Sequence, residues 1–299
     1  MAGKAVAGPK FVTGADEKYF FMAGILLESL KQFAPDVPLY VMDFGLSEGQ
    51  KRLLDAERIL LPMPAGLAPG MHPYKLKSSV DRFVGGVAGP WIWIDSDMFA
   101  VRECGAEILS RFDDFRRNGI RLAMTRDMGP DQTVGDFSRR YATPKLMPRL
   151  LADASLGAAP YLNAGIVFFP DDALLGDWRT LSAELELDTC WEQNALNVMA
   201  HSAGAGLEIF DSQVWNVHSR LLDEVIAGPA GLQCGGRPVN FLHCTSPAPG
   251  HLSEFSFPLM LEGAATSGYA RMFTHAELRQ RQLDLLMRFV QSHPPLRMP

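Results

Sequence analysis

The segment Trp91-Ile92-Trp93-Ile94-Asp95-Ser96-Asp97 is a short apolar run that ends in two aspartates separated by one serine. A run of this length is typical of a buried β-strand. Side chains two positions apart on an extended chain point the same way, so Asp95 and Asp97 can converge on one cation. Mg²⁺ and Mn²⁺ prefer oxygen ligands and commonly bridge carboxylates to substrate phosphates. The segment therefore predicts a metal diphosphate site, although Asp and Ser are also ordinary turn residues.

Composition limits the classes of protein to which this chain can belong. The 299 residues are 47% hydrophobic and 21% charged, which is enough to bury a core in one large or two small domains. The formal net charge is −6 and Lys and Arg form no cluster, so we expect no nucleic-acid partner. Four scattered cysteines without metal-ligand spacing predict reduced thiols. Because residues 1–10 lack an apolar signal region and no run reaches about 18 apolar residues, we predict a cytoplasmic protein.

Apolar runs alternate with helical patterns through the first half of the chain. We predict strands over 11–13, 38–42, 59–61, 91–94 and 121–125, with helices over 19–33, 47–54 and 74–87. This order predicts an α/β protein with a doubly wound sheet flanked by helices. Ligands of such sheets bind beyond the carboxyl ends of the strands, where Asp16, Asp95, Asp97 and Asp127 would share one crevice.

The second half of the chain is less regular. We expect a loop over 129–160, strands over 166–169 and 239–243, and a helix over 191–199. Apolar and arginine residues alternate over 276–290 and predict a terminal amphipathic helix. Docking on the core is favoured for this helix over lying on a membrane surface.

Several separated segments match one family in the same order. The nine residues from Phe11 to Tyr19, of sequence FVTGADEKY, resemble its first strand and nucleotide loop, and Asp95-Ser96-Asp97 occupies its DxD position. Asn163-Ala164-Gly165 resembles its NAG motif, Glu192-Gln193-Asn194-Ala195-Leu196-Asn197 its DQDxLN motif, and His243 the histidine of its metal site. Over residues 11–251 the chain thus resembles the glycogenin-like and lipopolysaccharide galactosyltransferase-like family of retaining GT-A glycosyltransferases, glycosyltransferase family 8.

The resemblance implies a fold and a reaction. It implies a GT-A nucleotide-diphospho-sugar transferase fold, with a Rossmann-like mixed sheet in a catalytic domain of residues 1–260. Residues 261–299 would be a C-terminal amphipathic helical extension. Asp95, Asp97 and His243 would hold Mn²⁺ or Mg²⁺, although His243 alone also reads as a core histidine. A UDP-sugar would donate a hexose to an acceptor hydroxyl with retention of configuration.

Further roles follow from the same resemblance, and each has a plain structural alternative. Asp16 would accept the uracil imide N–H or cap a helix. Lys77 would face the donor phosphate, with Lys75 and Arg82 as rivals, and Ser96 would also lie at the donor. Asp127, Asn163 and Gly165 would approach the sugar ring. Glu192 and Gln193 would lie beside the anomeric carbon.

Two retaining mechanisms remain open from the sequence. One is a double displacement, and the other is a same-face displacement in which the leaving diphosphate accepts the acceptor's proton. Gln193 is a poor nucleophile, which favours the second.

Two departures from the family pattern concern donor binding and specificity. The family often follows its histidine with Gly-x-x-Lys-Pro-Trp, whereas this chain has Ser246-Pro247-Ala248-Pro249-Gly250-His251, so the phosphate-binding lysine is missing. His251 or Lys77 would have to replace it. The family's DQD is Glu192-Gln193-Asn194 here, which neutralises one acid.

Other functions compete with glycosyl transfer. A non-catalytic sugar-nucleotide or glycan-binding protein is compatible with the altered segment after His243. A sugar-1-phosphate nucleotidyltransferase would need a Gly-rich, basic first loop that residues 13–16 lack, and a metal-dependent phosphatase fits less well still. The acceptor is open between a glycan, a protein, a lipid-linked sugar and a small molecule. Loops 129–160 and 211–236, with Trp215, Asn216 and His218, are expected to face it, although Trp215 fits a core position equally well. The basic terminal helix could contact the inner face of the membrane.

Overall fold

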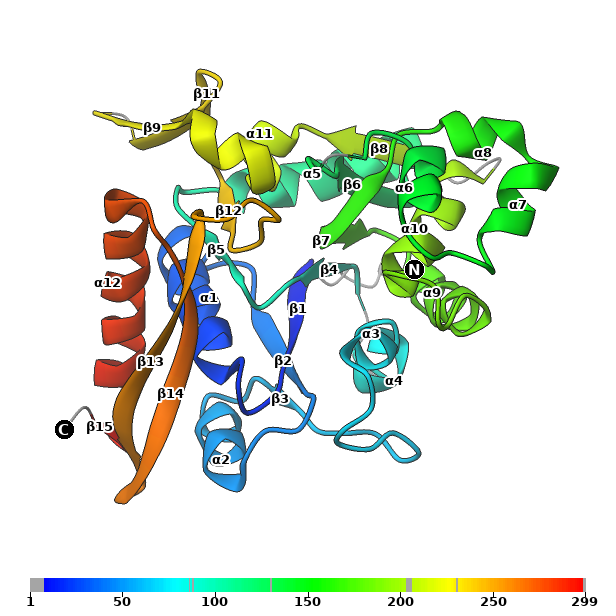
Figure 1. Cartoon of the computed structure of the whole chain (residues 1–299). Coiled ribbons are helices and arrows are strands. Elements are labelled where there is room, and N and C mark those ends of the chain that lie inside the picture. The colour runs from blue at the N-terminus through cyan, green and yellow to red at the C-terminus, as the bar shows by residue number, and fades with distance from the viewer. Residues whose placement is uncertain are drawn as a thin grey trace, which may run out of the picture.

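A computed structural model of the chain describes residues 8–85, 87, 89–129, 131–202, 206–229 and 231–297. Its central element is a mixed seven-stranded sheet of strand order β3-β2-β1-β4-β7-β6-β8 (Figure 1). The strands are β1 (Lys10–Ala15), β2 (Leu39–Asp43), β3 (Leu60–Leu61), β4 (Trp91–Ile94), β6 (Leu122–Arg126), β7 (Leu162–Phe169) and β8 (Leu207–Phe210). β7 runs antiparallel to β4 and β6, and the other pairs are parallel. The predicted mixed α/β class is confirmed, while residues 1–7 lie outside the described part.

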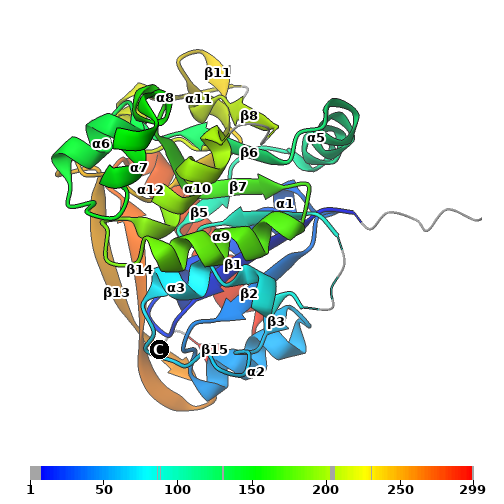
Figure 2. The same ribbon diagram turned by 90° about the vertical axis from the view of Figure 1, so that its right-hand side faces the viewer.

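Helices cover both faces of this sheet because its central strands are apolar on both sides. Along β4, Ile92 and Ile94 belong to one core cluster, and Trp91 and Trp93 belong to the other. The first cluster is covered by α1 (Phe20–Phe33), α5 (Gly105–Asn118) and α12 (Ala276–Ser292). The second is covered by α9 (Ala173–Glu184) and α10 (Trp191–His201), and Figure 2 shows α9 across the face turned to the viewer.

Most predicted elements of the first half are present, with α2 at Glu48–Ala56. Ser47 is the N-cap of α2 and forms a reciprocal capping box with Gln50. The single helix predicted over 74–87 is wrong. It is divided into α3 (Pro73–Lys77) and α4 (Val80–Phe83), because the hydroxyls of Ser78 and Ser79 bond back to the Lys75 carbonyl at 3.3 and 2.7 Å.

The loop predicted over 129–160 is also wrong. It contains α6 (Val134–Arg140), α7 (Met147–Ala152) and α8 (Ala154–Ala158). Thr133 and Asp136 form a capping box that starts α6, a pattern readable from Thr-x-x-Asp in the sequence. The segment 211–236 contains α11 (Ser212–Trp215), a 3-10 helix over Ser219–Glu224, and the strands β9 (Val225–Gly228) and β10 (Gly231–Cys234). β10 lies between β9 and β11 (Arg237–Pro238) and pairs with both.

The C-terminal part forms a long hairpin and a helix. β13 (Leu252–Leu261) pairs with β14 (Ala264–Phe273) and with β15 (Leu296–Arg297). The predicted terminal helix is α12, and its apolar side chains, Leu278, Leu285, Leu286 and Phe289, are buried in the core cluster that contains α1. The division at residue 260 remains a prediction, and that position falls within β13. Within the described residues, no helix is both long and apolar enough to span a bilayer.

A two-stranded pair outside the main sheet positions the candidate site. β5 (Met98–Ala100) runs antiparallel to β12 (Phe241–His243), with His243 opposite Met98. This register places His243, far away in sequence, directly beside Asp97. The Cys244 N–H donates to the Asp97 carbonyl at 2.8 Å and closes the pair at the same point.

Candidate functional site

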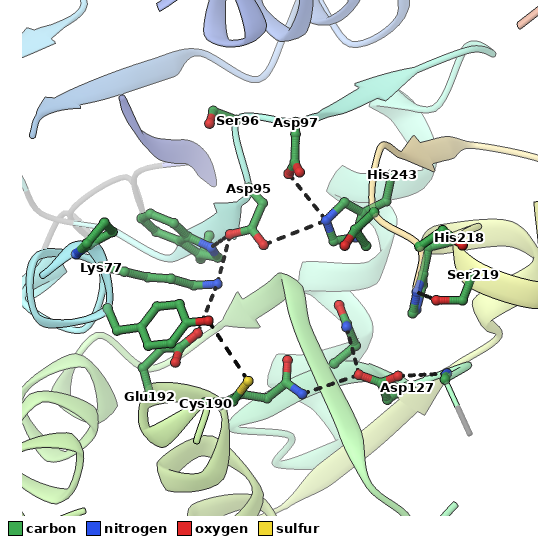
Figure 3. Close-up of a pocket in the computed structure, with 18 of the residues that line it drawn as sticks. Lys77, Asp95, Ser96, Asp97, Asp127, Cys190, Glu192, His218, Ser219 and His243 are labelled. Carbon is green, nitrogen blue, oxygen red and sulfur yellow. Dashed lines mark hydrogen bonds and ion pairs between the residues drawn. The ribbon is translucent and has the colours of Figure 1, made fainter. Parts of the chain in front are cut away.

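A cavity of about 670 Å³ lies beyond the carboxyl ends of β1, β4 and β6 (Figure 3). Of the residues predicted to hold the metal, bind the donor or take part in catalysis, all but Gly165 and His251 line it: Asp16, Lys77, Asp95, Ser96, Asp97, Asp127, Asn163, Glu192, Gln193 and His243. The four aspartates predicted to share one crevice do so. The fold therefore gathers residues from seven separate sequence segments into one cavity, as expected for strand ends in an α/β sheet.

Asp95, Asp97 and His243 form a candidate metal centre. Their ligand atoms all lie within 4.8 Å of one another. His243 Nε2 is 3.3 Å from Asp97 Oδ1 and 3.8 Å from Asp95 Oδ2. Two carboxylate oxygens and one imidazole nitrogen are a donor set that divalent cations accept, with positions left for other ligands. The residues present therefore fit a divalent metal.

A chain of hydrogen bonds sets the tautomer of His243. The Gly165 N–H donates to Asn163 Oδ1 at 2.8 Å, so that oxygen is an acceptor and also receives Asn216 Nδ2 at 2.8 Å. Asn216 Oδ1 is then left to accept from His243 Nδ1, 3.0 Å away. With its proton on Nδ1, His243 directs the lone pair of Nε2 at the two aspartates. Asn216, predicted to contact the acceptor, instead orients a candidate metal ligand.

Gly165 packs against the ring of His243. It is not one of the described residues that line the cavity. A Cβ at this position would be 2.6 Å from His243 Cε1 and 2.8 Å from Asn163 Oδ1. The lack of a side chain thus makes room for the imidazole ring. Its carbonyl accepts the Asp95 N–H at 2.8 Å, so Gly165 also fixes the backbone of the acidic segment. The predicted contact of Gly165 with the sugar remains a prediction.

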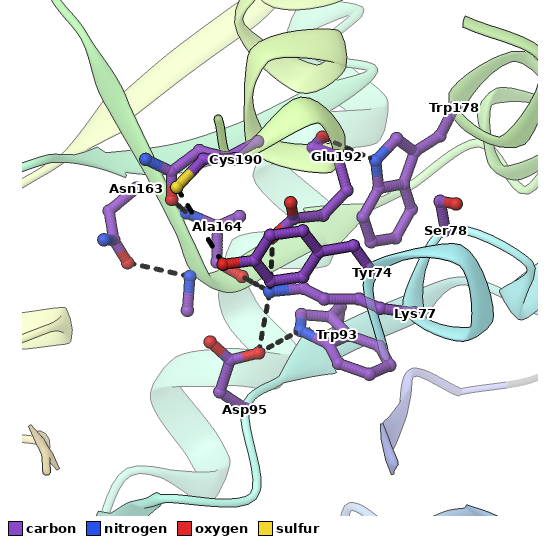
Figure 4. Close-up of polar contacts among 12 residues, drawn as sticks. Tyr74, Lys77, Ser78, Trp93, Asp95, Asn163, Ala164, Trp178, Cys190 and Glu192 are labelled. Atoms are coloured by element: carbon purple, nitrogen blue, oxygen red, sulfur yellow. Dashed lines mark hydrogen bonds and ion pairs between the residues drawn. The ribbon is translucent and has the colours of Figure 1, made fainter. Parts of the chain in front are cut away.

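Lys77 is buried and holds Asp95 (Figure 4). Its Nζ lies 2.8 Å from Asp95 Oδ1, 3.0 Å from the Ala164 carbonyl oxygen and 3.7 Å from Glu192 Oε1. Burial alone would lower the pKa of Lys77, but Asp95 and Glu192 together raise it above its ordinary value. Trp93 Nε1 donates to the same Asp95 oxygen at 2.8 Å. Asp95 therefore has one oxygen engaged by the protein and the other turned towards His243.

The other cations considered for the donor phosphate are engaged elsewhere. Lys75 Nζ lies 3.6 Å from Glu186, and Arg82 donates to the Ala65 carbonyl. His251 Nε2 contacts Asp223 Oδ1 at 2.9 Å and its Nδ1 contacts Ser246 Oγ at 2.8 Å. His251 lies outside the lining of the cavity, as far as the described residues show.

Asp127 is the centre of a cluster of amides at the other end of the cavity. Its Oδ2 accepts from Asn163 Nδ2 at 3.0 Å and from Gln193 Nε2 at 3.3 Å. Gln193 Oε1 in turn accepts the Ala164 N–H at 3.0 Å. The Gln193 amide is therefore held at both ends, and its oxygen is occupied by the backbone.

Glu192 and Asn194 flank that glutamine in the first turn of α10. Burial raises the pKa of Glu192, the cation of Lys77 lowers it and Asp95 raises it, with a net rise. Its Oε2 is buried without a hydrogen-bond partner in the described part of the chain. Asn194 is fully buried, accepting from the Tyr161 hydroxyl and donating to the Thr189 carbonyl, both at 2.9 Å. A carboxylate has no N–H and could not donate to the Thr189 carbonyl, which explains the amide at position 194.

Asp16 and Tyr19 also line the cavity. Asp16 Oδ1 accepts the Tyr19 N–H at 2.8 Å in the turn before α1. The N-cap residue of α1 is Tyr19, so the alternative of Asp16 as a helix cap is wrong, and its contact with uracil stays a prediction. Gly14 lies under Phe44, whose ring occupies the space that a Cβ at Gly14 would take.

His218 is the remaining candidate from the sequence that lines the cavity. It is buried, its Nδ1 contacts Ser219 Oγ at 2.9 Å, and its Nε2 has no partner in the residues that the structure describes. Burial lowers the pKa of His218 to about 4, with a smaller opposite effect from Asp127. Trp215 stacks on Phe210 and Phe241 in the core, which is one of the two positions expected for it.

Comparison with solved structures places this architecture among known folds. Mouse xyloside xylosyltransferase 1 matches with a TM-score of 0.50 at 13% identity, over 80% of this chain and 98% of that protein. The fold is that of a GT-A glycosyltransferase. The galactosyltransferase LgtC matches with a TM-score of 0.48 at 15% identity, over 81% of this chain and 88% of LgtC.

The bifunctional glycosyltransferase WbbM gives a TM-score of 0.47 at 14% identity, and 73% of this chain spans only 41% of WbbM. No protein-family model and no curated protein sequence matches this chain. The likeness to the mouse xylosyltransferase, at 13% identity, concerns the fold alone, and the reaction has to be argued from the site.

Proposed function

We propose that the protein is a metal-dependent retaining glycosyltransferase that moves a hexose from a UDP-sugar to an acceptor hydroxyl. The observation that carries this proposal is that a set of candidate metal ligands and a set of hydrogen-bonding side chains share one cavity in a glycosyltransferase-like fold. Asp95, Asp97 and His243 supply the ligands for a divalent cation such as Mn²⁺ or Mg²⁺. Asp127 and Gln193, bonded to each other, supply hydrogen-bonding groups for a sugar.

The chain's own residues divide the work of the reaction. Asp95 and Asp97 hold the cation, which when bound would stabilise negative charge on the leaving diphosphate as a Lewis acid. Lys77 keeps Asp95 oriented, since its ammonium lies 2.8 Å from one carboxylate oxygen. Asp127, Asn163 and Gln193 would bind the hydroxyls of the donor sugar. Asp16 and Tyr19 would lie at the nucleotide base.

The same-face displacement is the mechanism that this arrangement supports better. A double displacement needs a nucleophile, and the Gln193 oxygen is occupied by the Ala164 N–H. The Glu192 carboxylate is also engaged, because one of its oxygens lies 3.7 Å from the Lys77 ammonium. In the same-face route the acceptor oxygen bonds to the anomeric carbon as the bond from that carbon to the diphosphate breaks. The acceptor proton moves to the leaving diphosphate, so no protein base is needed.

A non-catalytic sugar-nucleotide-binding protein is the second candidate. It is favoured by the missing lysine after His243 and by the engagement of His251 with Asp223 at 2.9 Å. The acceptor, which we expect to be a glycan or another hydroxyl compound, is a further part of the proposal. Peripheral membrane contact through α12 and a cytoplasmic location stay predictions from the sequence.

Calorimetry with a panel of nucleotide sugars, with and without Mn²⁺, tests the proposal. We expect metal-dependent binding of a UDP-sugar that is lost in the Asp95→Ala/Asp97→Ala variant. Slow Mn²⁺-dependent hydrolysis of the bound donor, with the released sugar examined by NMR for its anomeric configuration, separates the enzyme from the binding protein. Binding without hydrolysis or transfer favours the binding protein, and absence of binding across the panel contradicts both.

A further inference from the structure

Arg271 reaches the candidate metal centre from the C-terminal hairpin. It lies on β14, opposite Glu254 of β13. Its Nη1 lies 3.8 Å from Asp97 Oδ2 and donates to the Cys244 carbonyl at 3.4 Å, and its Nη2 donates to the Tyr19 hydroxyl at 3.2 Å. Three segments of the site therefore meet at one guanidinium: the acidic segment, the strand of His243 and the start of α1.

The negative charge around the candidate metal centre explains why a diphosphate bound there would need a positively charged side chain. Asp95, Asp97 and Glu192 are acidic, and a diphosphate would add further negative charge. Lys77 cannot meet that charge without leaving Asp95, because it is 7% exposed and already bonded to that carboxylate and to a carbonyl. His251, the other replacement considered for the missing lysine, is held by Asp223 and Ser246.

Arg271 differs from both in having unused hydrogen-bonding capacity at an accessible position. Its side chain is 29% exposed. A guanidinium has five N–H donors in a planar fork that matches phosphate oxygens, and the bonds to Cys244, Tyr19 and Tyr269 leave part of that fork unused. Arg271 is not itself among the lining residues of the cavity in the described part of the chain, but Tyr19 and Asp97, which it contacts, both are.

We propose that Arg271 binds the diphosphate of the nucleotide donor, from an element outside the segment in which the resembled family carries its lysine. This inference rests on the proposed function and names a residue for donor binding that the sequence motifs do not contain. The C-terminal hairpin then contributes to the donor site as well as covering the core.

A simpler role for Arg271 would be to brace Asp97 in place, and the two roles predict different changes. If Arg271 only braces Asp97, its removal weakens metal binding and everything that depends on the metal. If it binds the diphosphate, its removal takes a positive charge away from the metal and leaves metal affinity unchanged or higher. Diphosphate affinity then falls while metal affinity does not.

The experiment compares Arg271→Ala, Arg271→Gln and Arg271→Lys with the wild type. Mn²⁺ affinity is measured on the free protein by electron paramagnetic resonance. Nucleoside diphosphate affinity is measured by calorimetry in saturating Mn²⁺, starting with UDP and including GDP and ADP, and the matching nucleoside is followed by ligand-observed NMR. Arg288→Ala is the control, because Arg288 is an exposed arginine of α12 that bonds to Gln32.

We expect Arg271→Ala and Arg271→Gln to bind the nucleoside diphosphate about ten- to hundredfold more weakly, the loss of one charge-assisted hydrogen bond. Nucleoside and Mn²⁺ affinity should not fall, Arg271→Lys should retain part of the diphosphate affinity, and Arg288→Ala should match the wild type. Unchanged diphosphate affinity, or a parallel loss of Mn²⁺ affinity, overturns the role of Arg271 and leaves the proposed function standing. A wild type that binds none of the nucleoside diphosphates contradicts the proposed function, and this inference with it.

Discussion

Gly165→Ala tests the candidate metal centre without altering any of its ligands. The added Cβ would be 2.6 Å from His243 Cε1, 2.7 Å from His243 Nδ1 and 2.8 Å from Asn163 Oδ1. Contacts below 3.0 Å cannot be kept, so the imidazole has to move by several tenths of an ångström. The backbone at Gly165 has no positive φ, so alanine itself is tolerated there. The expected effect is therefore displacement of His243 and not local unfolding.

The magnitude follows from the two consequences of that displacement. Overpacking at a buried position destabilises by about 1–3 kcal/mol. Disturbing the partner that orients a ligating histidine typically weakens metal binding about 10–100-fold, and here the hydrogen bond of His243 to Asn216 is disturbed directly. We expect both effects in the same variant.

Urea unfolding and Mn²⁺ titration of the same samples measure the two effects. Gly176→Ala is the matched control, because a Cβ at Gly176 in α9 meets only Asp81 Oδ2 at 3.9 Å, an ordinary contact. The control should be as stable as the wild type or slightly more stable and should bind Mn²⁺ normally. A folded Gly165→Ala protein with wild-type Mn²⁺ affinity would refute the assignment of His243 as a ligand.

Three further predictions concern the surroundings of the site. Lys77→Met should lower the free energy of unfolding, measured by urea titration, by about 3–5 kcal/mol, because Asp95 and Glu192 lose their buried cationic partner. A loss below about 1 kcal/mol, the value of an exposed ion pair, would contradict this. Asn216→Ala should reduce Mn²⁺ affinity about 10–100-fold by releasing His243, and equal affinity would mean that the hydrogen bond does not orient the ring. A chain that ends at residue 260 lacks β14 and α12, which pack on α1, so circular dichroism should show no cooperative unfolding; a cooperative transition would support the division at that residue.

The sequence predicted the acidic part of the site well because that part depends on local geometry. Alternation along β4 places Asp95 beyond a buried strand, and the ends of neighbouring strands meet at one edge of a sheet. The same reasoning places Asp127 after β6. Mixed strand direction and the core-docked terminal helix were likewise within reach of the hydrophobic pattern and the resemblance.

The rest of the site depends on tertiary contacts that no local pattern specifies. His243 was predicted only through the resemblance, since the antiparallel register of β12 on β5 places it beside Asp97. Arg271 lies in a hairpin for which no strands were predicted. It is 174 positions from Asp97 in the sequence, too far for a local pattern to connect the two. The role of Asn216 is visible only once the orientation of the neighbouring amides is known.

The candidate metal centre and the amide cluster around Asp127 are connected by one residue. Asn163 accepts from Asn216 with its oxygen, which fixes the tautomer of His243, and donates to Asp127 with its nitrogen. An aspartate at this position would lose the second bond and repel Asp127, and an alanine would lose both bonds. Because buried polar groups left without partners are costly, neither group of side chains can be rearranged independently of the other. The amide of the Asn163-Ala164-Gly165 motif is therefore required by both halves of the site, and the glycine two positions later is required by the ring that this amide orients.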